Sequence, residues 1–290
     1  MIEKTIINLK YWTNFLGLGR SMLALCTLVN ILFSKNNYVF LGLPSKFDYS
    51  NIEYYNIFYI FKDNLIFAKI ISIIILISVL SGYFPRITAA LHWWVTYSFF
   101  TSSFTVEGGD QVASILTFLL IPILLLDKRK NHWQEDFHYH SFYSKTIAFF
   151  VYSLIILQIS IIYFNASIGK LNVEEWANGT AVYYWLNDTV FGLNYTLLKM
   201  INPLLKSPIF VTILTWGAIG IELALAFAIF GLKQKKLSII FVSIGFLLHL
   251  SFAICFGLIS FFFAMFGALI LYLLAVNNNF NFKKYGTPRI

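Results

Sequence analysis

The sequence predicts an all-α, polytopic integral membrane protein, a helical bundle with about eight transmembrane helices. Its 290 residues are 59% hydrophobic and only 12% charged, whereas an average soluble domain has about 25% charged residues. The mean hydropathy is +0.74. A water-soluble chain of this length could not bury so much apolar surface in one core. The composition therefore excludes a soluble enzyme and a disordered protein, and we expect the lipid bilayer to be the main solvent.

Each predicted span has close to the ~20 residues that a helix needs to cross the hydrocarbon layer. The stretch from Leu237 to Ala275 is too long for one helix, so we divide it into a hairpin that turns near Gly257. The spans are Leu16–Phe33, Asn64–Phe84, Ile87–Phe104, Gln111–Leu126, Thr146–Ser167, Ile209–Phe230, Leu237–Cys255 and Leu258–Ala275. They predict a single transmembrane domain over residues 1–290, with its core at about 11–275.

Basic residues in the loops predict the topology, because Lys and Arg concentrate on the cytoplasmic side. With both termini inside, the inner segments hold 13 basic residues and the outer loops hold 6. We therefore interpret the net charge of +8 mainly as a topology signal. The basic residues form no patch interleaved with aromatic residues, so no nucleic-acid partner is predicted.

Two long outer segments, Ser34–Asp63 and Gly169–Pro208, are expected to cap the bundle. Their aromatic residues and short apolar runs favour interfacial helices or re-entrant pieces at the membrane surface. Cys26 and Cys255 lie within apolar runs, where we expect packing roles. Their spacing predicts neither a disulfide framework nor a metal site.

Ionisable groups inside a membrane span are costly unless they are paired or hydrated, so each is a candidate site. Arg20 and Lys69 lie near span ends, where snorkelling to the head groups explains them. His92 could be a satisfied packing residue in the third span. Glu222 and His249 lie in the middle of their spans. For both, an interhelical hydrogen bond and a functional role are equally good interpretations.

The outer end of the fifth span combines a lysine with acidic and aromatic residues. Lys170 follows small residues, and Glu174, Glu175 and Trp176 come soon after it. Snorkelling of Lys170 beside an ordinary helix cap is one interpretation. In the other, a partly apolar pocket disfavours the ammonium, and the neutral amine of Lys170 acts as a base.

The segment with Lys170-Leu171, Glu175-Trp176, Gly179 and Tyr183-Tyr184 resembles the Lys-Leu, Trp, Gly and Tyr stretch of vitamin K-dependent γ-carboxylases. The same family contains bacterial membrane proteins with an HTTM domain, so the resemblance implies an HTTM-like fold. Glu222 resembles an acidic position in the following helix of that family, and His249 resembles the histidine in the helix after it.

The stretch from His92-Trp93-Trp94 to Gly108-Gly109-Asp110 is more similar still to the SdpB branch of this family. That branch matures a secreted toxin peptide together with SdpA. The resemblance therefore implies an SdpA-like protein and a secreted peptide precursor as partners. It also implies a multi-pass protein of the bacterial cytoplasmic membrane, with its site on the outer face.

The resemblance implies that Lys170 is a base acting on a reduced quinone, menaquinone or vitamin K hydroquinone. Asp110, Glu222 and His249 would complete the catalytic set. Residues expected to bind the quinone are His92, Trp93, Trp176 and Tyr184. The chain departs from the carboxylases in two ways. Gly109-Asp110 replaces an Asn-His pair, and the large peptide-binding lumenal domain has no counterpart. Either a partner supplies peptide binding, or the membrane core performs different chemistry.

Two functions of different classes follow. The first is an SdpB-like maturation factor that modifies a secreted antimicrobial peptide. The second is non-enzymatic: a peptide exporter, scaffold or immunity protein that binds the peptide within the bundle. The sequence has no nucleotide-binding motif and no protease motif, so an ATP-driven pump and a protease are not expected.

Overall fold

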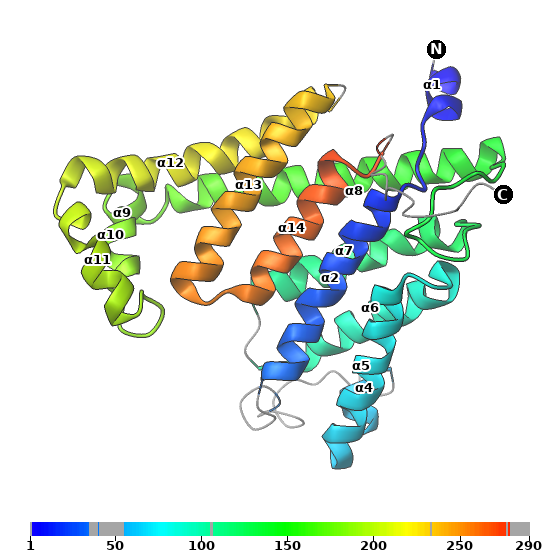
Figure 1. The fold of residues 1–290 in the computed structure, drawn as a ribbon, viewed down its shortest axis with the longest axis horizontal. Helices are drawn as coiled ribbons and strands as arrows, with labels where there is room; N and C mark the ends of the chain where they lie inside the picture. The colour runs from blue at the N-terminus through cyan, green and yellow to red at the C-terminus, as the bar shows by residue number, and fades with distance from the viewer. Residues whose placement is uncertain are drawn as a thin grey trace, which may run out of the picture.

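The computed structural model describes residues 2–34, 40, 55–104, 107–232, 234–276 and 278. Within these ranges the regular structure is helical, apart from one isolated bridge between Tyr83 and Asn131 (Figure 1). The all-α prediction is therefore confirmed.

Each predicted span corresponds to one long helix. These helices are α2 (Asn14–Phe33), α5 (Leu65–Ser81), α6 (Pro85–Ser102), α7 (Gly108–Leu125), α8 (Phe142–Lys170), α12 (Pro208–Phe227), α13 (Lys235–Phe256) and α14 (Ile259–Leu273). The predicted hairpin is confirmed, because α13 ends at Gly257 in the left-handed conformation, with a φ of 70°. Glycine adopts this conformation without steric cost.

Six segments of the described chain are long and apolar enough to cross a membrane by length and composition. They contain α2, α5, α7, α8, α12 and α13. Helix α14 has 15 residues, which span ~22 Å at 1.5 Å per residue, and α6 carries several polar residues. Full crossings by α6 and α14 stay predictions.

Shorter helices fill the connections. They are α1 (Ile2–Asn8), α4 (Ile57–Ile60), η1 (Lys62–Asn64), α9 (Glu174–Ala177), α10 (Ala181–Leu186), α11 (Tyr195–Leu205) and η2 (Ala228–Gly231). The predicted outer segment Gly169–Pro208 thus contains three short helices, and its depth in the bilayer stays a prediction.

Part of the topology prediction lies outside the described residues. This applies to most of Ser34–Asp63 and to Thr105 and Val106. It also applies to six of the counted loop charges, Lys35, Lys46, Lys233, Lys283, Lys284 and Arg289. The inside location of both termini stays a prediction.

Helix α14 is the centre of the bundle, in contact with α2, α7, α8 and α13 (Figure 1). Its tightest neighbour is α2, which comes from the other end of the chain. A Cβ atom on Gly267 would lie 2.9 Å from the carbonyl oxygen of Gly19 and 3.0 Å from Met22 Cβ. Small residues at such crossings let two membrane helices approach closely.

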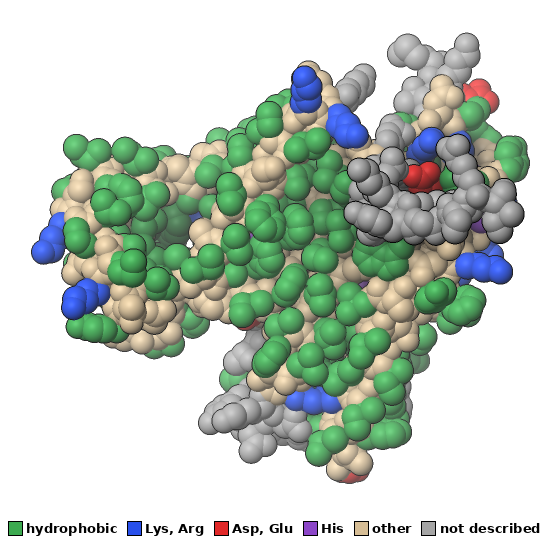
Figure 2. Space-filling model, viewed as in Figure 1, with side chains coloured by type: hydrophobic (Ala, Val, Ile, Leu, Met, Phe, Trp, Pro, Cys, Tyr) green, Lys and Arg blue, Asp and Glu red, His purple; other side chains and the backbone are tan. Residues whose placement is uncertain are grey.

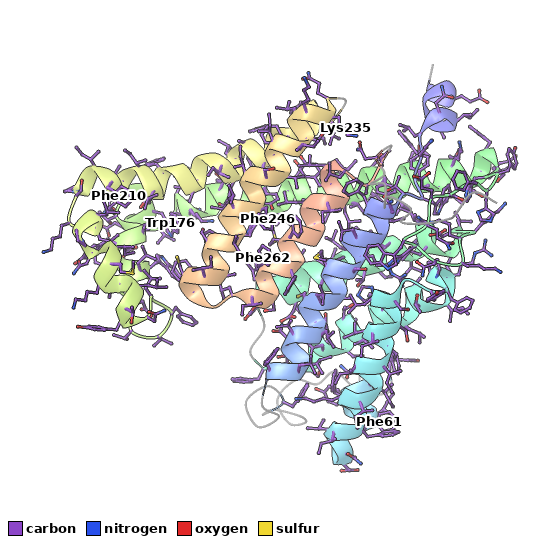
Figure 3. The ribbon with its side chains drawn as sticks, in the orientation of Figure 1. Phe61, Trp176, Phe210, Lys235, Phe246 and Phe262 are labelled. Atoms are coloured by element: carbon purple, nitrogen blue, oxygen red, sulfur yellow. The ribbon has the colours of Figure 1, made fainter. Side chains whose placement is uncertain are left out.

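Aromatic rings form the contact between α13 and α14. Phe246 packs edge-on against Phe262 and Phe266, with ring centroids 5.4 Å and 5.0 Å apart (Figure 3). On the outside of the bundle, apolar side chains cover the visible face (Figure 2). Exposed examples are Ile70 and Ile74 on α5 and Phe150 and Leu154 on α8. An apolar exterior is what a lipid environment requires.

The loop between α7 and α8 is held by polar contacts. Asp136 accepts hydrogen bonds at 3.0 Å from His138 Nδ1 and at 2.6 Å from His140 Nε2. The His140 ring stacks on Trp12, with centroids 3.7 Å apart. Burial opposes ionisation of Asp136, but the hydrogen bonds from His140 and His138 outweigh it and lower the pKa of Asp136 to about 2. The loop is thereby fixed to the segment that precedes α2.

We predict that Gly267→Ala lowers the stability of the bundle. The added methyl group would meet the α2 backbone, which has no flexible end to move aside, and overpacking of this kind costs about 1–3 kcal/mol. Unfolding in detergent, followed by circular dichroism, measures the change. Gly217→Ala is the matched control on α12, because a Cβ atom there meets nothing within 4 Å. Equal stabilities of the two variants would contradict the proposed contact.

We also predict a pH dependence for the contribution of Asp136. Its folded-state pKa lies below the ordinary 3.8, so the folded protein binds fewer protons there than the unfolded chain. The stabilisation is complete above pH 3.8 and is lost as the pH falls towards 2. The difference in melting temperature between the wild type and Asp136→Asn should shrink in this window. A difference that stays constant down to pH 2 would refute this assignment.

Candidate functional site

An ion pair joins the last residue of α8 to the second half of α12. Lys170 Nζ lies 2.7 Å from Oε1 and 2.6 Å from Oε2 of Glu222. The Glu222 side chain is 5% exposed and that of Lys170 is 20% exposed. Sequence analysis left open an interhelical hydrogen bond or a functional role for Glu222, and the structure pairs it with Lys170.

The chain after α8 folds back so that Trp176 covers the lysine. Lys170 Nζ lies 5.3 Å from the centre of the Trp176 ring, within the range of a cation–π interaction. Gly179, with a φ of 82°, places the backbone against Thr212 and Trp216 of α12. Glycine tolerates both the left-handed turn and the close approach. The residues that follow Lys170 are thus anchored to the helix that carries Glu222.

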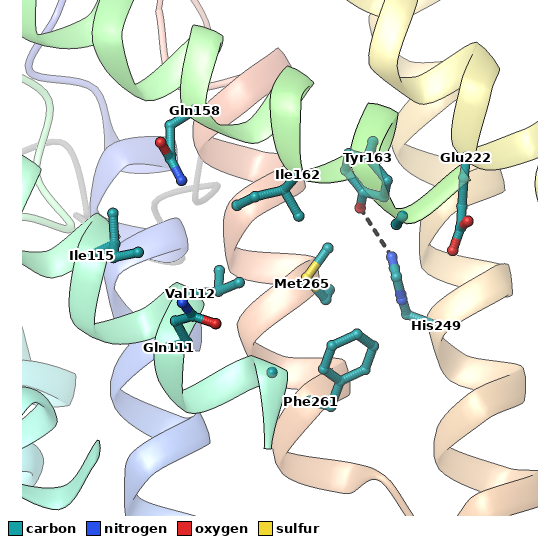
Figure 4. Close-up of a pocket in the computed structure, with 12 residues that line it drawn as sticks. Gln111, Val112, Ile115, Gln158, Ile162, Tyr163, Glu222, His249, Phe261 and Met265 are labelled. Atoms are coloured by element: carbon teal, nitrogen blue, oxygen red, sulfur yellow. Dashed lines mark hydrogen bonds between the residues drawn. The ribbon is translucent and has the colours of Figure 1, made fainter. Parts of the chain in front are cut away.

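A cavity of about 270 Å³ lies next to this ion pair, between α7, α8, α12, α13 and α14. Its walls combine aliphatic and aromatic groups with two carboxamides, a phenol, an imidazole and a carboxylate (Figure 4). The lining residues are Gly108, Gln111, Val112, Ile115, Gln158, Ile162, Tyr163, Ala166, Glu222, His249, Phe261 and Met265. Glu222 therefore belongs both to the ion pair and to the cavity wall.

A second polar pair crosses the cavity wall from α8 to α13. The Tyr163 hydroxyl lies 2.9 Å from His249 Nε2, and both residues are buried (Figure 4). His249 Nδ1 has no hydrogen-bond partner among the described residues. The Phe252 and Phe261 rings pack edge-on against the imidazole. Because Tyr163 fixes one ring nitrogen, the orientation of the imidazole is set while the other nitrogen remains available.

Sequence analysis did not identify Tyr163 as a site residue. It precedes Lys170 by seven residues, which is two helical turns, so both side chains share one face of α8. That spacing is the signal that could have found it. Tyrosine is common in membrane helices near the interface, so the residue type alone gave no indication.

Asp110 precedes the cavity-lining residue Gln111 in the sequence, but its side chain faces α2. Its Oδ1 accepts a 2.8 Å hydrogen bond from Asn30 and contacts Cys26. Asp110 and Glu107 form a capping box at the start of α7, which satisfies free backbone N–H groups there. Glu107 in turn accepts a 2.5 Å hydrogen bond from Ser260. Asp110 does not line the cavity, and its catalytic role stays a prediction.

None of the four predicted cofactor-binding residues lines the cavity. His92 is buried on α6, a helix that packs against α2, α5 and α7. Trp93 packs against Tyr97 and Phe118 on the surface of α6 and α7. Tyr184 is 58% exposed. Only Trp176 contacts a member of the predicted catalytic set, and the proposed roles of all four stay predictions.

We predict that Lys170 and Glu222 are energetically coupled. In a cycle of Lys170→Met, Glu222→Gln and the double variant, the interaction free energy should be about 1–2 kcal/mol, within the range for contacting residues. Each single variant leaves one polar group without its partner. Unfolding in detergent measures all four proteins.

A control cycle combines Lys170→Met with Asp63→Asn, a substitution just before α5. The effects of these two substitutions on the free energy of unfolding should be additive. Additivity in the Lys170–Glu222 cycle as well would contradict the ion pair.

Comparison with known proteins places the chain among bacterial relatives. It is 37% identical over 273 residues to the sporulation-delaying protein SdpB of Bacillus subtilis (strain 168), over 92% of this chain and 83% of that protein. It is 34% identical over 276 residues to the protein YitO of the same organism, over 93% of this chain and 88% of that protein. No family model and no solved structure matches, so the wider relation to HTTM proteins and γ-carboxylases stays a prediction. The similarity to SdpB over nearly the whole chain shows that this membrane protein belongs to the SdpB family.

Proposed function

We propose that this chain is a membrane-embedded factor in the maturation of a secreted toxin peptide, with Lys170 and Glu222 as its proton-transfer centre. Membership of the SdpB family supports a role in a sporulation-delaying toxin pathway. The observation that carries the chemical part is the Lys170–Glu222 pair beside a partly open cavity. The proposal includes an SdpA-like partner and a location in the bacterial cytoplasmic membrane, with the site on the outer face.

The cavity fits the head group of a reduced quinone. Its volume is about 270 Å³, near the lower end of the ~300–1,000 Å³ of small-molecule sites. Val112, Ile162 and Met265 offer apolar surface for a flat ring. Gln111, Gln158 and His249 offer hydrogen-bonding groups at several positions around it. A reduced quinone would supply a weakly acidic hydroxyl group and reducing equivalents.

Lys170 and Glu222 form a unit that changes protonation state without large movement. With the proton on the carboxyl group, the pair is neutral, and Glu222, which lines the cavity, would connect the Lys170 amine to a hydroxyl group bound there. Lys170 would hold the proton as an ammonium, whose positive charge would stabilise negative charge in the cavity. Trp176 shields the ammonium on one side by a cation–π contact. The low dielectric of the site strengthens each of these interactions.

The Tyr163–His249 pair lies at the same end of the cavity as Glu222 (Figure 4). Its hydrogen bond orients the imidazole, so that Nδ1 is able to exchange a hydrogen bond with a bound hydroxyl or carbonyl group. Tyr163 and His249 act in this proposal as positioning residues. The transfer of the proton falls to Lys170 and Glu222.

We predict that Lys170→Ala, expressed together with the neighbouring genes, abolishes the secretion of correctly modified, active peptide. A general base contributes about 10²–10⁴-fold to a rate, so the peptide yield should fall at least 100-fold. Mass spectrometry of the secreted peptide and a growth-inhibition assay measure the result. Lys199→Ala is the control, because Lys199 is an exposed lysine on nearby α11. Immunoblots verify equal amounts of both proteins in the membrane.

Two outcomes would overturn the proposal. One is a wild-type yield of modified peptide from Lys170→Ala. The other is the absence of extractable quinone from purified wild-type protein, combined with normal function of Lys170→Ala and Glu222→Gln. The second outcome would favour a peptide exporter, scaffold or immunity protein.

A further inference from the structure

A second group of buried charges lies where α2 and α6 meet the loop after α7. It contains Arg20, His92, Asp127, Arg129 and His132, whose exposed fractions run from 0% to 4%. None of these residues lines the cavity described above. The prediction that Arg20 snorkels is wrong, because its side chain is fully buried and donates a 2.8 Å hydrogen bond to Thr88.

Most of the hydrogen-bonding capacity of Arg20 is unused. Only Nη2 has a partner, whereas Nε and Nη1 have none among the described residues. A guanidinium stays protonated in proteins, so Arg20 does not escape the cost of burial by losing its charge. Leaving a buried charged donor without a partner costs more than the ≈ 1–3 kcal/mol of a neutral one. The two free nitrogens therefore point to an additional ligand.

The neighbouring carboxylate, that of Asp127, is already paired with Arg129. Asp127 accepts hydrogen bonds from Arg129 Nε at 3.0 Å and 3.2 Å and from Nη2 at 2.8 Å. Asp127 and Arg129 thus neutralise each other, and Arg20 remains as one uncompensated positive charge. Arg86 approaches from α6 and donates a 2.6 Å hydrogen bond to the Asp127 carbonyl oxygen. The local field is therefore positive.

Two histidines add further ring nitrogens without a partner. His132 Nδ1 and His92 Nε2 have no partner among the described residues, while His132 Nε2 lies 3.4 Å from the Ser21 hydroxyl. If Ser21 donates to Nε2, Nδ1 of His132 carries the proton and is able to donate it. Burial, together with the charges of Arg20 and Arg129, lowers the pKa of His132 to about 2. His132 is therefore neutral and adds a donor without adding charge.

We propose that Arg20, with His132 and His92 beside it, forms a buried binding site for one small monovalent anion. One anion would offset the uncompensated charge of Arg20 and accept hydrogen bonds from Arg20 Nε and Nη1. Complete dehydration favours a weakly hydrated ion of charge −1, because the cost of burying charge rises steeply for sulfate or phosphate. Chloride and a small carboxylate such as formate share the required chemistry.

Equilibrium binding of ³⁶Cl⁻ to the purified wild-type protein tests the site directly. We expect saturable binding of about one chloride per chain, displaced by bromide and not by sulfate. Competition with formate distinguishes the two candidate ligands, chloride and a small carboxylate. Tighter binding of formate would identify a carboxylate as the natural ligand. The absence of saturable binding of both chloride and formate to the wild type would overturn the proposal.

Variants locate the bound ion. Arg20→Lys keeps the positive charge but removes the planar guanidinium with its several N–H donors, so chloride affinity should fall at least tenfold. Arg86→Met is the matched control: it removes an arginine close to Asp127 whose guanidinium has a carbonyl partner, and it should retain binding. Unchanged affinity in Arg20→Lys, or equal losses in both variants, would also refute the site.

Discussion

The close approach of α2 and α14 at Gly19 and Gly267 is the contact on which the rest of the bundle depends. Lipid is as apolar as a helix surface, so membrane helices associate through tight packing and interhelical hydrogen bonds. The glycines bring the two backbones together and make α14 the central helix. Nearly every residue in the second half of α14 is buried as a result. Its other face, with Phe261 and Met265, forms a wall of the cavity.

Interhelical polar contacts then fix the helices around this centre. The polar contacts of helix α8 include two on one face, from Tyr163 to α13 and from Lys170 to α12. Because these two contacts are two turns apart, they define both the position and the rotation of α8. The cavity lies beside these two contacts, so its polar groups are oriented before any ligand enters. Such preorganisation is what a proton-transfer site requires.

Hydropathy was enough to predict the helices, because a chain in lipid must form long apolar helices. It was also enough to select Glu222 and His249, since ionisable residues in a span are rare. It did not show that Lys170 pairs with Glu222, because that contact joins residues 52 positions apart. His92 and Trp93 were grouped with the site from resemblance alone, and the packing of α6 against α2, α5 and α7 places them elsewhere. Pairing of helices depends on side-chain shape, which a hydropathy profile does not contain.

The two buried polar groups differ in charge balance, and this difference suits them to different tasks. Lys170 and Glu222 are neutral as a pair, whether the proton lies on the amine or on the carboxyl group. A proton is able to move between them without creating net charge in a low dielectric. Arg20 is a fixed cation whose neighbours Asp127 and Arg129 already cancel each other. Moving a proton among these groups does not neutralise the charge of Arg20, whereas a bound anion does. The first arrangement therefore suits the proposed proton transfer, and the second suits the proposed binding of an anion.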